Sequence, residues 1–194
     1  MVHPLVIIKK YPMEKQTSKF PEVGWMKERF QILQLNEQIC EFDWTIQPGG
    51  SVPEHYHKES EEYFKVLEGE VSFMINGELI IGKPNFELTI PKLIYHSVSN
   101  KSSQVAKCRV SYQPVADQGK FFEILFFLFR KNPDDKNALF KAMYISKQMG
   151  YREFSSLKGG MKILMGIMMS FIKLFAPITG WNKLLNDYRL KPNP

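Results

Sequence analysis

Three histidines and one glutamate stand at spacings that allow their side chains to meet. His55 and His57 are two residues apart, so on a β-strand both imidazoles project from the same face. After a short turn the returning strand offers Glu62 on its apolar face, and His96 follows on a later strand among apolar residues. Imidazole nitrogens and carboxylate oxygens are common ligands of transition metals. The four residues therefore predict one metal site inside a β-structure.

A less specific interpretation exists for each of these residues taken singly. One inward histidine is more often a hydrogen-bonded core residue than a metal ligand. Three imidazoles and a carboxylate buried together are costly without an ion, because each loses its hydration, so the group as a whole favours metal binding. The neighbouring Glu61 is expected to face solvent. His3 lies in an unpatterned terminus and is expected to be solvated.

The segments that carry these residues have the alternation of antiparallel strands. From about residue 30 to residue 113, short runs of alternating apolar and polar residues are separated by proline, glycine and asparagine. Asn76-Gly77 fits the two-residue turn of a β-hairpin. One run places four apolar side chains on the same face: Cys40, Phe42, Trp44 and Ile46. The pattern predicts a barrel or sandwich with these faces inward.

After Pro114 the periodicity becomes that of helices. A helix is expected from Asp117 to Phe129, although this run is apolar nearly all round, and strand stays open for part of it. Three further helices are expected: one between Asn132-Pro133 and Gly150, one between Gly159-Gly160 and Pro177, and one from Thr179 to Tyr188. We therefore divide the chain into a lead-in (1–29), a β-barrel (30–116) and a helical C-terminal extension (117–194).

Two groups of residues resemble the motifs of a known family. The first group is Gly49, five residues, His55-Tyr56-His57, four residues, Glu62, six residues and Gly69, which is similar to the first cupin motif at every marked position. Pro91, His96 and Asn100 resemble the second motif. Leu93 stands where that motif usually has glycine, and the interval from Gly82 to Pro91 is longer than usual. These departures affect the turn and not the candidate ligands.

The resemblance covers roughly residues 30 to 113 and implies a mainly β fold. It implies a double-stranded β-helix, or jelly-roll cupin barrel, followed here by the α-helical C-terminal extension. Near the barrel mouth His55, His57, Glu62 and His96 would hold a divalent transition metal: Fe, Mn, Ni or Zn. Strand parity places five aromatic residues on the wall of a substrate pocket: Phe42, Trp44, Phe64, Phe73 and Tyr112.

This site leaves the function open among several classes. A metal-dependent oxygenase acting on a small apolar or aromatic substrate is the first hypothesis, with Glu62 as the candidate catalytic base. A non-catalytic small-molecule-binding cupin is the second, and a metal-dependent isomerase or lyase is the third. Fold and ligand set do not separate these hypotheses, because cupins include all of them.

Composition narrows the choice of partners and location. Residues 1–116 hold 13 Lys and Arg against 14 Asp and Glu, whereas residues 117–194 hold 13 against 6, so the extension carries the whole net charge of +6. It has no arginine cluster or nucleic-acid motif, and we expect no nucleic acid partner. The first residues do not resemble a secretory signal, so a cytoplasmic location is expected. Cys40 and Cys108 lie in apolar runs and are expected to be core residues.

The segment 161–175 presents a broad apolar face that must be covered. Lys162 and Lys173 bound only about ten uncharged residues, fewer than the roughly 20 that a transmembrane helix needs. The favoured interpretation is packing of this helix on its own barrel or on a second subunit, as in a homodimer. The alternative is peripheral contact with a membrane surface, which the basic charge of the extension favours.

Overall fold

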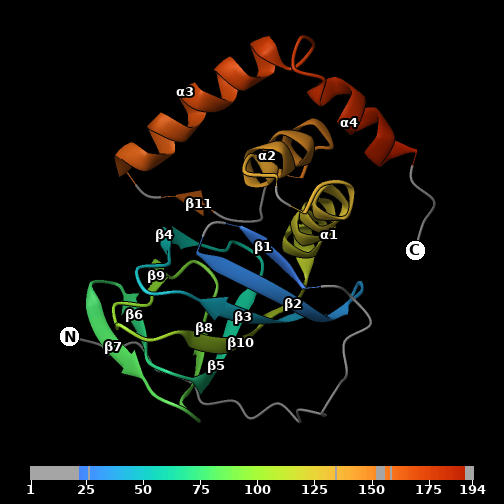
Figure 1. The fold of residues 1–194 in the computed structure, drawn as a ribbon. Coiled ribbons are helices and arrows are strands. Elements are labelled where there is room, and N and C mark those ends of the chain that lie inside the picture. The colour runs from blue at the N-terminus through green and yellow to red at the C-terminus, as the bar shows by residue number, and fades with distance from the viewer. Residues whose placement is uncertain (1–21, 26, 134, 152–155, 158, 191–194) are drawn as a thin grey trace.

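The computed structural model describes residues 22–25, 27–133, 135–151, 156–157 and 159–190. His3 lies outside the described residues. Within them two antiparallel sheets face each other, and four helices follow (Figure 1). The predicted fold class, a β-barrel with a helical C-terminal extension, is confirmed.

The first sheet has six strands in the order β1-β2-β3-β10-β5-β8. Their bounds are β1 Val23–Trp25, β2 Glu28–Leu35, β3 Cys40–Ile46, β10 Ala106–Gln113, β5 Glu61–Glu68 and β8 Glu87–Ile90. Strands β1 and β2 start this sheet before residue 30, inside the segment expected to be a lead-in. The reason is visible in the sequence, because Glu28, Phe30 and Ile32 alternate with polar residues and pair with β3.

The second sheet has five strands in the order β11-β4-β9-β6-β7. Their bounds are β11 Ser156–Leu157, β4 Ser51–Tyr56, β9 His96–Ser99, β6 Val71–Ile75 and β7 Glu78–Gly82. Asn76 and Gly77 both have positive φ in the turn between β6 and β7, as the predicted hairpin requires. Strand β11 comes from the C-terminal extension and pairs with β4 at His55 and Tyr56, which the sequence did not predict.

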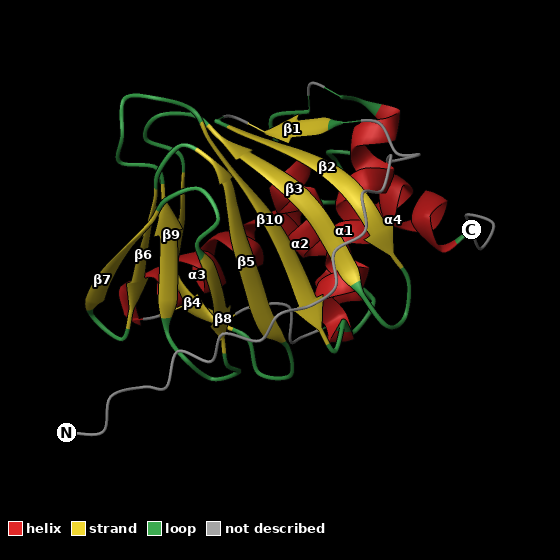
Figure 2. Ribbon diagram, turned by 90° about the horizontal axis from the view of Figure 1, so that it is seen from below, coloured by secondary structure: helices red, strands yellow, loops and turns green. Residues whose placement is uncertain are grey.

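The helices gather on one side of the strands (Figures 1 and 2). They are α1 Ala116–Lys131, α2 Ala138–Gln148, α3 Gly159–Phe175 and α4 Trp181–Arg189. The segment 116–131 is helical throughout. Its N-cap is Val115 and not Asp117, which lies in the first turn. Among the described residues no helix is both long enough and apolar enough to cross a bilayer.

One hydrophobic core joins the sheets to α1. The ring centroids of Phe42 on β3 and Phe122 on α1 are 4.6 Å apart, and Phe122 also lies 6.0 Å from Tyr112 on β10. Cys40 and Cys108 are buried free thiols in this core. Since α1 fills the space in front of the first sheet, the inner aromatic residues of the barrel contact the helix as well as one another.

Candidate metal centre and its cavity

The structure brings the four candidate ligands together. His55, His57, Glu62 and His96 are all buried, and their ligand atoms lie within 4.8 Å of one another. They come from three strands and the turn after β4, since β4 pairs His55 with His96 of β9, and β5 places Glu62 opposite Tyr112 of β10. Residues far apart in the sequence thus form one cluster inside the barrel.

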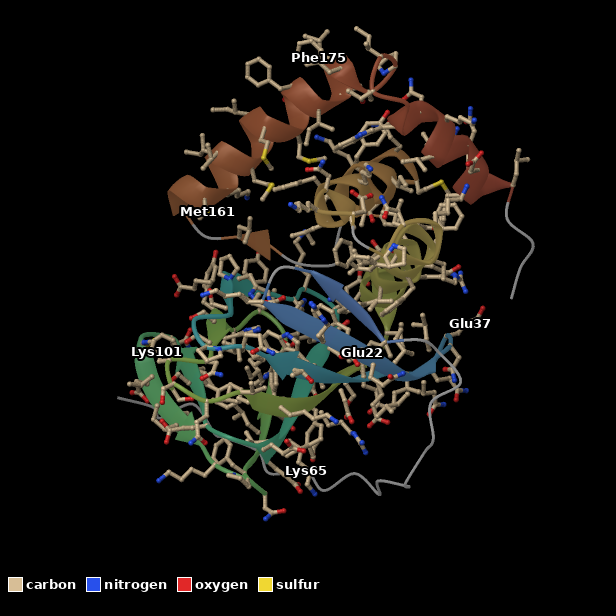
Figure 3. The ribbon with its side chains drawn as sticks, in the orientation of Figure 1. Glu22, Glu37, Lys65, Lys101, Met161 and Phe175 are labelled. Carbon is tan, nitrogen blue, oxygen red and sulfur yellow. The ribbon has the colours of Figure 1, made fainter. Side chains whose placement is uncertain are left out.

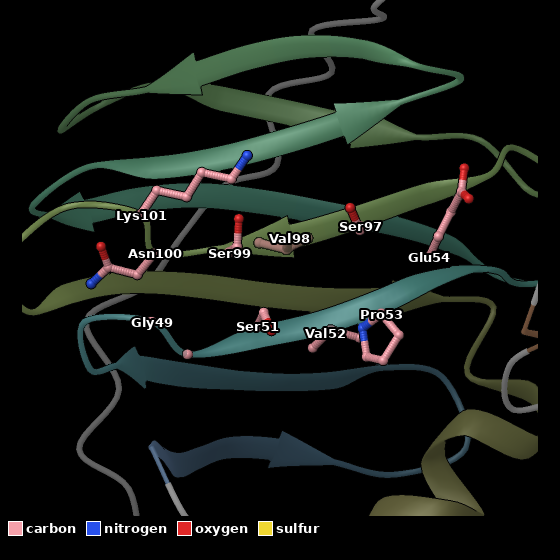
Figure 4. Close-up of a pocket in the computed structure, with 11 residues that line it drawn as sticks. Gly49, Ser51, Val52, Pro53, Glu54, Ser97, Val98, Ser99, Asn100 and Lys101 are labelled. Carbon is pink, nitrogen blue, oxygen red and sulfur yellow. The ribbon is translucent and has the colours of Figure 1, made fainter. Parts of the chain in front are cut away.

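A β-bulge in β4 orients His55. Val52 pairs with Val98 and His55 pairs with His96, so β4 uses one more residue than β9 between these two pairs. The extra residue reverses the parity of the strand, and therefore Val52 and His55 both face the interior. A hollow of about 450 Å³ lies on the other side of β4 and β9, around the bulge. Figure 4 labels residues that line it, among them Ser51, Glu54, Ser97 and Lys101.

The turn before His96 replaces the usual glycine with a left-handed leucine. Leu93 has φ of 68°, a conformation that costs a non-glycine residue free energy. Its backbone N–H donates to the carbonyl oxygen of His57 at 2.7 Å. This bond ties the turn to the ligand segment, so the exchange of glycine for leucine leaves the ligands in place.

Hydrogen bonds fix the orientation of two imidazole rings. Nδ1 of His55 donates to the carbonyl oxygen of Pro53 at 2.7 Å, and Nδ1 of His96 donates to that of Ile94 at 2.9 Å. A neutral ring with its proton on Nδ1 has its lone pair on Nε2. In both residues Nε2 is therefore the atom able to bind an ion.

Glu62 lies at the centre of the cluster. Its Oε2 is 2.8 Å from Nε2 of His96 and 3.2 Å from Nε2 of His57, and its Oε1 accepts a hydrogen bond of 2.5 Å from the hydroxyl of Tyr112. If His96 were neutral, the lone pair on its Nε2 would face a lone pair on Oε2 of Glu62 at 2.8 Å, and the two would repel each other. A positive charge, either a second proton on the ring or a metal ion, removes this conflict, and the donor set therefore fits a cation.

The pKa values of the cluster follow from burial and from these contacts. Burial, with a further contribution from His96, lowers the pKa of His55 to about 3, so this ring is neutral at physiological pH. Burial alone would raise the pKa of Glu62, but the hydrogen bonds from His57 and His96 hold it well below its usual range. Burial and the neighbouring carboxylate raise the pKa of Tyr112, which therefore remains a hydrogen-bond donor.

The cluster opens onto a largely apolar cavity of about 480 Å³. Four of the predicted wall residues line it: Phe42, Trp44, Phe64 and Tyr112. Phe73 does not line it. Phe73 is fully buried on β6, where its ring packs 5.1 Å from that of Phe64 and 6.0 Å from that of Phe86, and it belongs to the core of the barrel.

The C-terminal extension supplies much of the remaining wall. Residues of α1, α2, β11 and α3 line the cavity: Gln118, Phe121, Phe122, Leu125, Leu139, Met143, Leu157, Met161, Lys162 and Met165. The sequence reasoning assigned no pocket residue to this part of the chain. It also missed Glu28 and Phe30 of β2, although their alternation with Ile32 was a signal that they share an inward face.

Comparison with known proteins agrees with this geometry. Residues 42–112 match the family model described as the cupin domain. These residues are a cupin domain. The match contains all four candidate ligands.

Individual relatives are similar to the cupin domain and not to the whole chain. The tetracenomycin polyketide synthase protein TcmJ of Streptomyces glaucescens is 30% identical over 71 residues, which are 37% of this chain and 48% of that protein. The chain thus matches about half the length of this curated relative. The protein TT1209 from Thermus thermophilus is 25% identical and has a TM-score of 0.43, over 45% of this chain and 84% of that one. An RmlC-like cupin from Shewanella frigidimarina is 14% identical with a TM-score of 0.47, over 53% and 92% of the respective chains.

Proposed function

We propose that the cupin domain binds one divalent transition-metal ion and that the chain is a metal-dependent oxygenase for a small apolar or aromatic substrate. One observation carries the proposal: four ligand atoms from His55, His57, Glu62 and His96 converge within 4.8 Å beside a largely apolar cavity. Three imidazoles and one carboxylate suit Fe, Mn, Ni or Zn. When bound, such an ion supplies a Lewis acid, and in the case of iron or manganese a redox centre, at the cavity wall.

The chain itself contributes orientation and exclusion of water. The carbonyl oxygens of Pro53 and Ile94 hold the rings of His55 and His96, and the hydroxyl of Tyr112 holds Glu62. The aromatic residues of β3 and α1 leave little water around a bound substrate, which strengthens electrostatic interactions inside the cavity. A substrate held in one orientation against the cluster needs no further ordering before it reacts.

Glu62 is the carboxylate placed to move a proton in this proposal. Its Oε1 accepts a hydrogen bond from Tyr112, and its Oε2 faces Nε2 of His57 and Nε2 of His96, where a positive charge keeps the carboxylate ionised. Release of Oε2 from its two imidazole partners would raise its affinity for a proton, and Tyr112 would keep Oε1 in position meanwhile. The residue would then accept a proton from a substrate in the cavity, as a general base does.

Metal content tests the first half of the proposal. We expect close to one transition-metal ion per chain in the purified full-length protein, and loss of that ion in His57→Ala. The variant His3→Ala, which replaces the one histidine outside the cluster, is the matched control and should keep its metal. Equal and negligible metal in all three proteins after reconstitution would contradict the metal centre.

Dioxygen consumption tests the second half. Protein loaded anaerobically with Fe(II) is mixed with a library of small aromatic compounds, and dioxygen uptake is recorded. Uptake that depends on the compound and is lost in His57→Ala supports the oxygenase. Full metal occupancy without uptake for any compound would reject the oxygenase and favour a non-catalytic binding cupin or a metal-dependent isomerase or lyase.

A further inference from the structure

Polar atoms without hydrogen-bond partners line the cavity. Among the described residues, four buried side-chain atoms have no hydrogen-bond partner: Trp44 Nε1, Gln118 Oε1, Thr89 Oγ1 and Ser146 Oγ. Trp44 and Gln118 both line the cavity. A buried polar group without a partner destabilises the fold, so native proteins rarely leave one unless a ligand, ion or water completes it.

Glu28 is a third polar group on the same wall. Its side chain lines the cavity and is 8% exposed. Within the described part of the chain, no hydrogen bond or ion pair reaches its carboxyl group. Burial raises the pKa of Glu28 to about 7, so both the acid and the carboxylate are accessible near neutral pH. In either form the group can bond to a hydroxyl.

The register of the first sheet places Trp44 and Glu28 near each other. Glu28 pairs with Ile46, and Trp44 pairs with Phe30, so Trp44 and Glu28 occupy diagonal inward positions on neighbouring strands. Such diagonal side chains are within reach of each other when they are long or aromatic.

Both residues lie far from the ligand cluster. Glu62 shares a row across the sheet with Tyr112 and Cys40. Trp44 is four residues farther along β3 than Cys40, and Glu28 pairs with Ile46, which is six residues farther than Cys40. At a rise of about 3.3 Å per residue, these separations along the strand are about 13 Å for Trp44 and about 20 Å for Glu28. The cavity therefore has the metal ligands at one end and a separate polar pair toward the other, with aromatic rings between them.

We propose that Trp44 and Glu28 form a second polar subsite, which binds a hydroxyl group of an aromatic ligand in the cavity. The indole N–H of Trp44 donates to the hydroxyl oxygen. The hydroxyl bonds in turn to the carboxyl group of Glu28, while Phe30, Phe42 and Phe122 contact the aromatic ring. The inference deepens the proposed function, on which its substrate assignment rests, by naming hydroxylated aromatic compounds as the ligand class.

Binding of 2-naphthol and naphthalene to the full-length protein tests this subsite. Isothermal titration calorimetry is carried out after removal of metal with a chelator, so that a ligand–metal contact does not contribute. We expect 2-naphthol to bind about three- to tenfold more tightly than naphthalene, the effect of one or two hydrogen bonds. Trp44→Phe and Glu28→Met should abolish this preference, whereas Glu28→Gln, which keeps hydrogen-bonding atoms, should retain it.

The control is Trp181→Phe, which changes an indole on α4 outside the cavity and should leave the preference intact. Equal affinity of the wild type for the two compounds, binding of neither, or a preference that survives both Trp44→Phe and Glu28→Met would overturn the subsite. Because the measurement uses metal-free protein, failure of the metal centre does not alter it. If Glu28→Met does not fold, Trp44→Phe and the wild-type comparison decide the outcome.

An independent observation concerns the outward face of α3. Six large apolar side chains on this helix are 50–68% exposed: Ile163, Leu164, Ile167, Phe171, Leu174 and Phe175. The opposite face packs on the core through Met165, Met169 and Ile172. Figure 3 shows α3 at the periphery of the molecule, with Met161 and Phe175 at its two ends. The adjoining turn adds Ile178, which is 84% exposed.

The charges around this face favour an anionic partner. Between Ser156 and Asn186 the sequence has four lysines and no acidic residue. Lys162 and Lys173 are exposed and lie on one flank of the apolar face. If a second copy of the chain covered this face, the lysines on the flank of one copy would approach the same lysines of the other copy, with no acidic residue to compensate their charge. An anionic lipid surface satisfies both the charge and the apolar face.

We further propose that the outward face of α3 docks on an anionic membrane surface, with the helix parallel to it. In a flotation assay at low salt, the full-length protein should bind vesicles of phosphatidylcholine and phosphatidylserine in equal parts and bind pure phosphatidylcholine vesicles several-fold less. Ile167→Asp should abolish binding. Leu79→Asp, on the exposed side of β7 and 53% exposed in the wild type, is the matched control and should bind normally.

Absence of binding to the anionic vesicles would overturn this proposal, as would equal binding by Ile167→Asp. Analytical ultracentrifugation supplies the competing outcome. A wild-type dimer that Ile167→Asp converts to a monomer would show that a second copy covers α3, and it would equally overturn the membrane assignment.

Discussion

Replacement of Glu28 by glutamine should change how the stability of the protein depends on pH. The unfolded carboxyl has a pKa near 4.5, and burial raises that of the folded state to about 7. The folded state therefore binds the proton more tightly than the unfolded state. Below pH 4.5 the group is protonated in both states. As the pH rises through 7, the wild type loses stability relative to Glu28→Gln, because ionisation is costly only in the buried site.

The size of this loss follows from the two pKa values. They differ by about 2.5, and each pH unit corresponds to ~1.4 kcal/mol, so the free energy of unfolding should change by about 3 kcal/mol between the acidic and the alkaline limit. Glu28 is 8% exposed, so solvent screening reduces this figure little. The glutamine variant has no titrating group there and should show none of this loss.

Urea unfolding near pH 4.5 and at about pH 8 measures the effect. The quantity compared is the difference in unfolding free energy between wild type and Glu28→Gln, in which the titration of all other groups cancels. Glu22→Gln, at an exposed position just before β1, serves as the matched control and should parallel the wild type. A wild-type-minus-variant difference that stays constant across this pH range would refute the reasoning and show that the Glu28 carboxyl is hydrated or paired in solution.

Three further outcomes are expected from the site and its support. Glu62→Gln should weaken metal retention and thermal stability, measured by elemental analysis and calorimetry, whereas Glu61→Gln should leave both nearly intact; damage by the second variant alone would place the strand in the wrong register. Tyr112→Phe removes the hydrogen bond to Glu62 and should lower metal affinity about 10- to 100-fold in a chelator competition, and unchanged affinity would deny the hydroxyl a positioning role. Phe122→Ala should lower the free energy of unfolding by about 3 kcal/mol in urea titrations, because it removes the ring 4.6 Å from that of Phe42; a loss below about 1 kcal/mol would contradict the packing of α1 on the barrel.

Strand parity predicted which candidate ligands face the interior, because the alternation of side chains along a strand is local. The spacing of His55 and His57 predicted that both face the interior, although His57 lies just after the end of β4, and the parity of β5 separates Glu62 from Glu61. Strand parity did not predict which of the inward-facing residues reach the cavity. Phe64 and Phe73 both point inward, but only the position of their strands in the barrel decides that Phe64 reaches the cavity and Phe73 packs behind it.

The contribution of the C-terminal extension could not be predicted from periodicity. A helix that is apolar on nearly every side, like α1, can pack against many partners, and tertiary structure decides which elements contact it. Phe121, Phe122 and Leu125 line the cavity because the connection after β10 directs α1 across the open side of the first sheet. The residues between Pro114 and Asp117 do not predict the direction that α1 takes after β10.

Strand β11 protects β4 from unwanted partners. Without the two residues Ser156 and Leu157, β4 would end its sheet with free backbone groups at His55 and Tyr56, next to the candidate metal ligands. Exposed strand edges recruit strands of other chains and promote aggregation. A pair of residues is too short to offer a new template, so the extension terminates the sheet as well as lining the cavity. Mutations that detach β11 would therefore be expected to reveal themselves first as loss of solubility, before any change in chemistry.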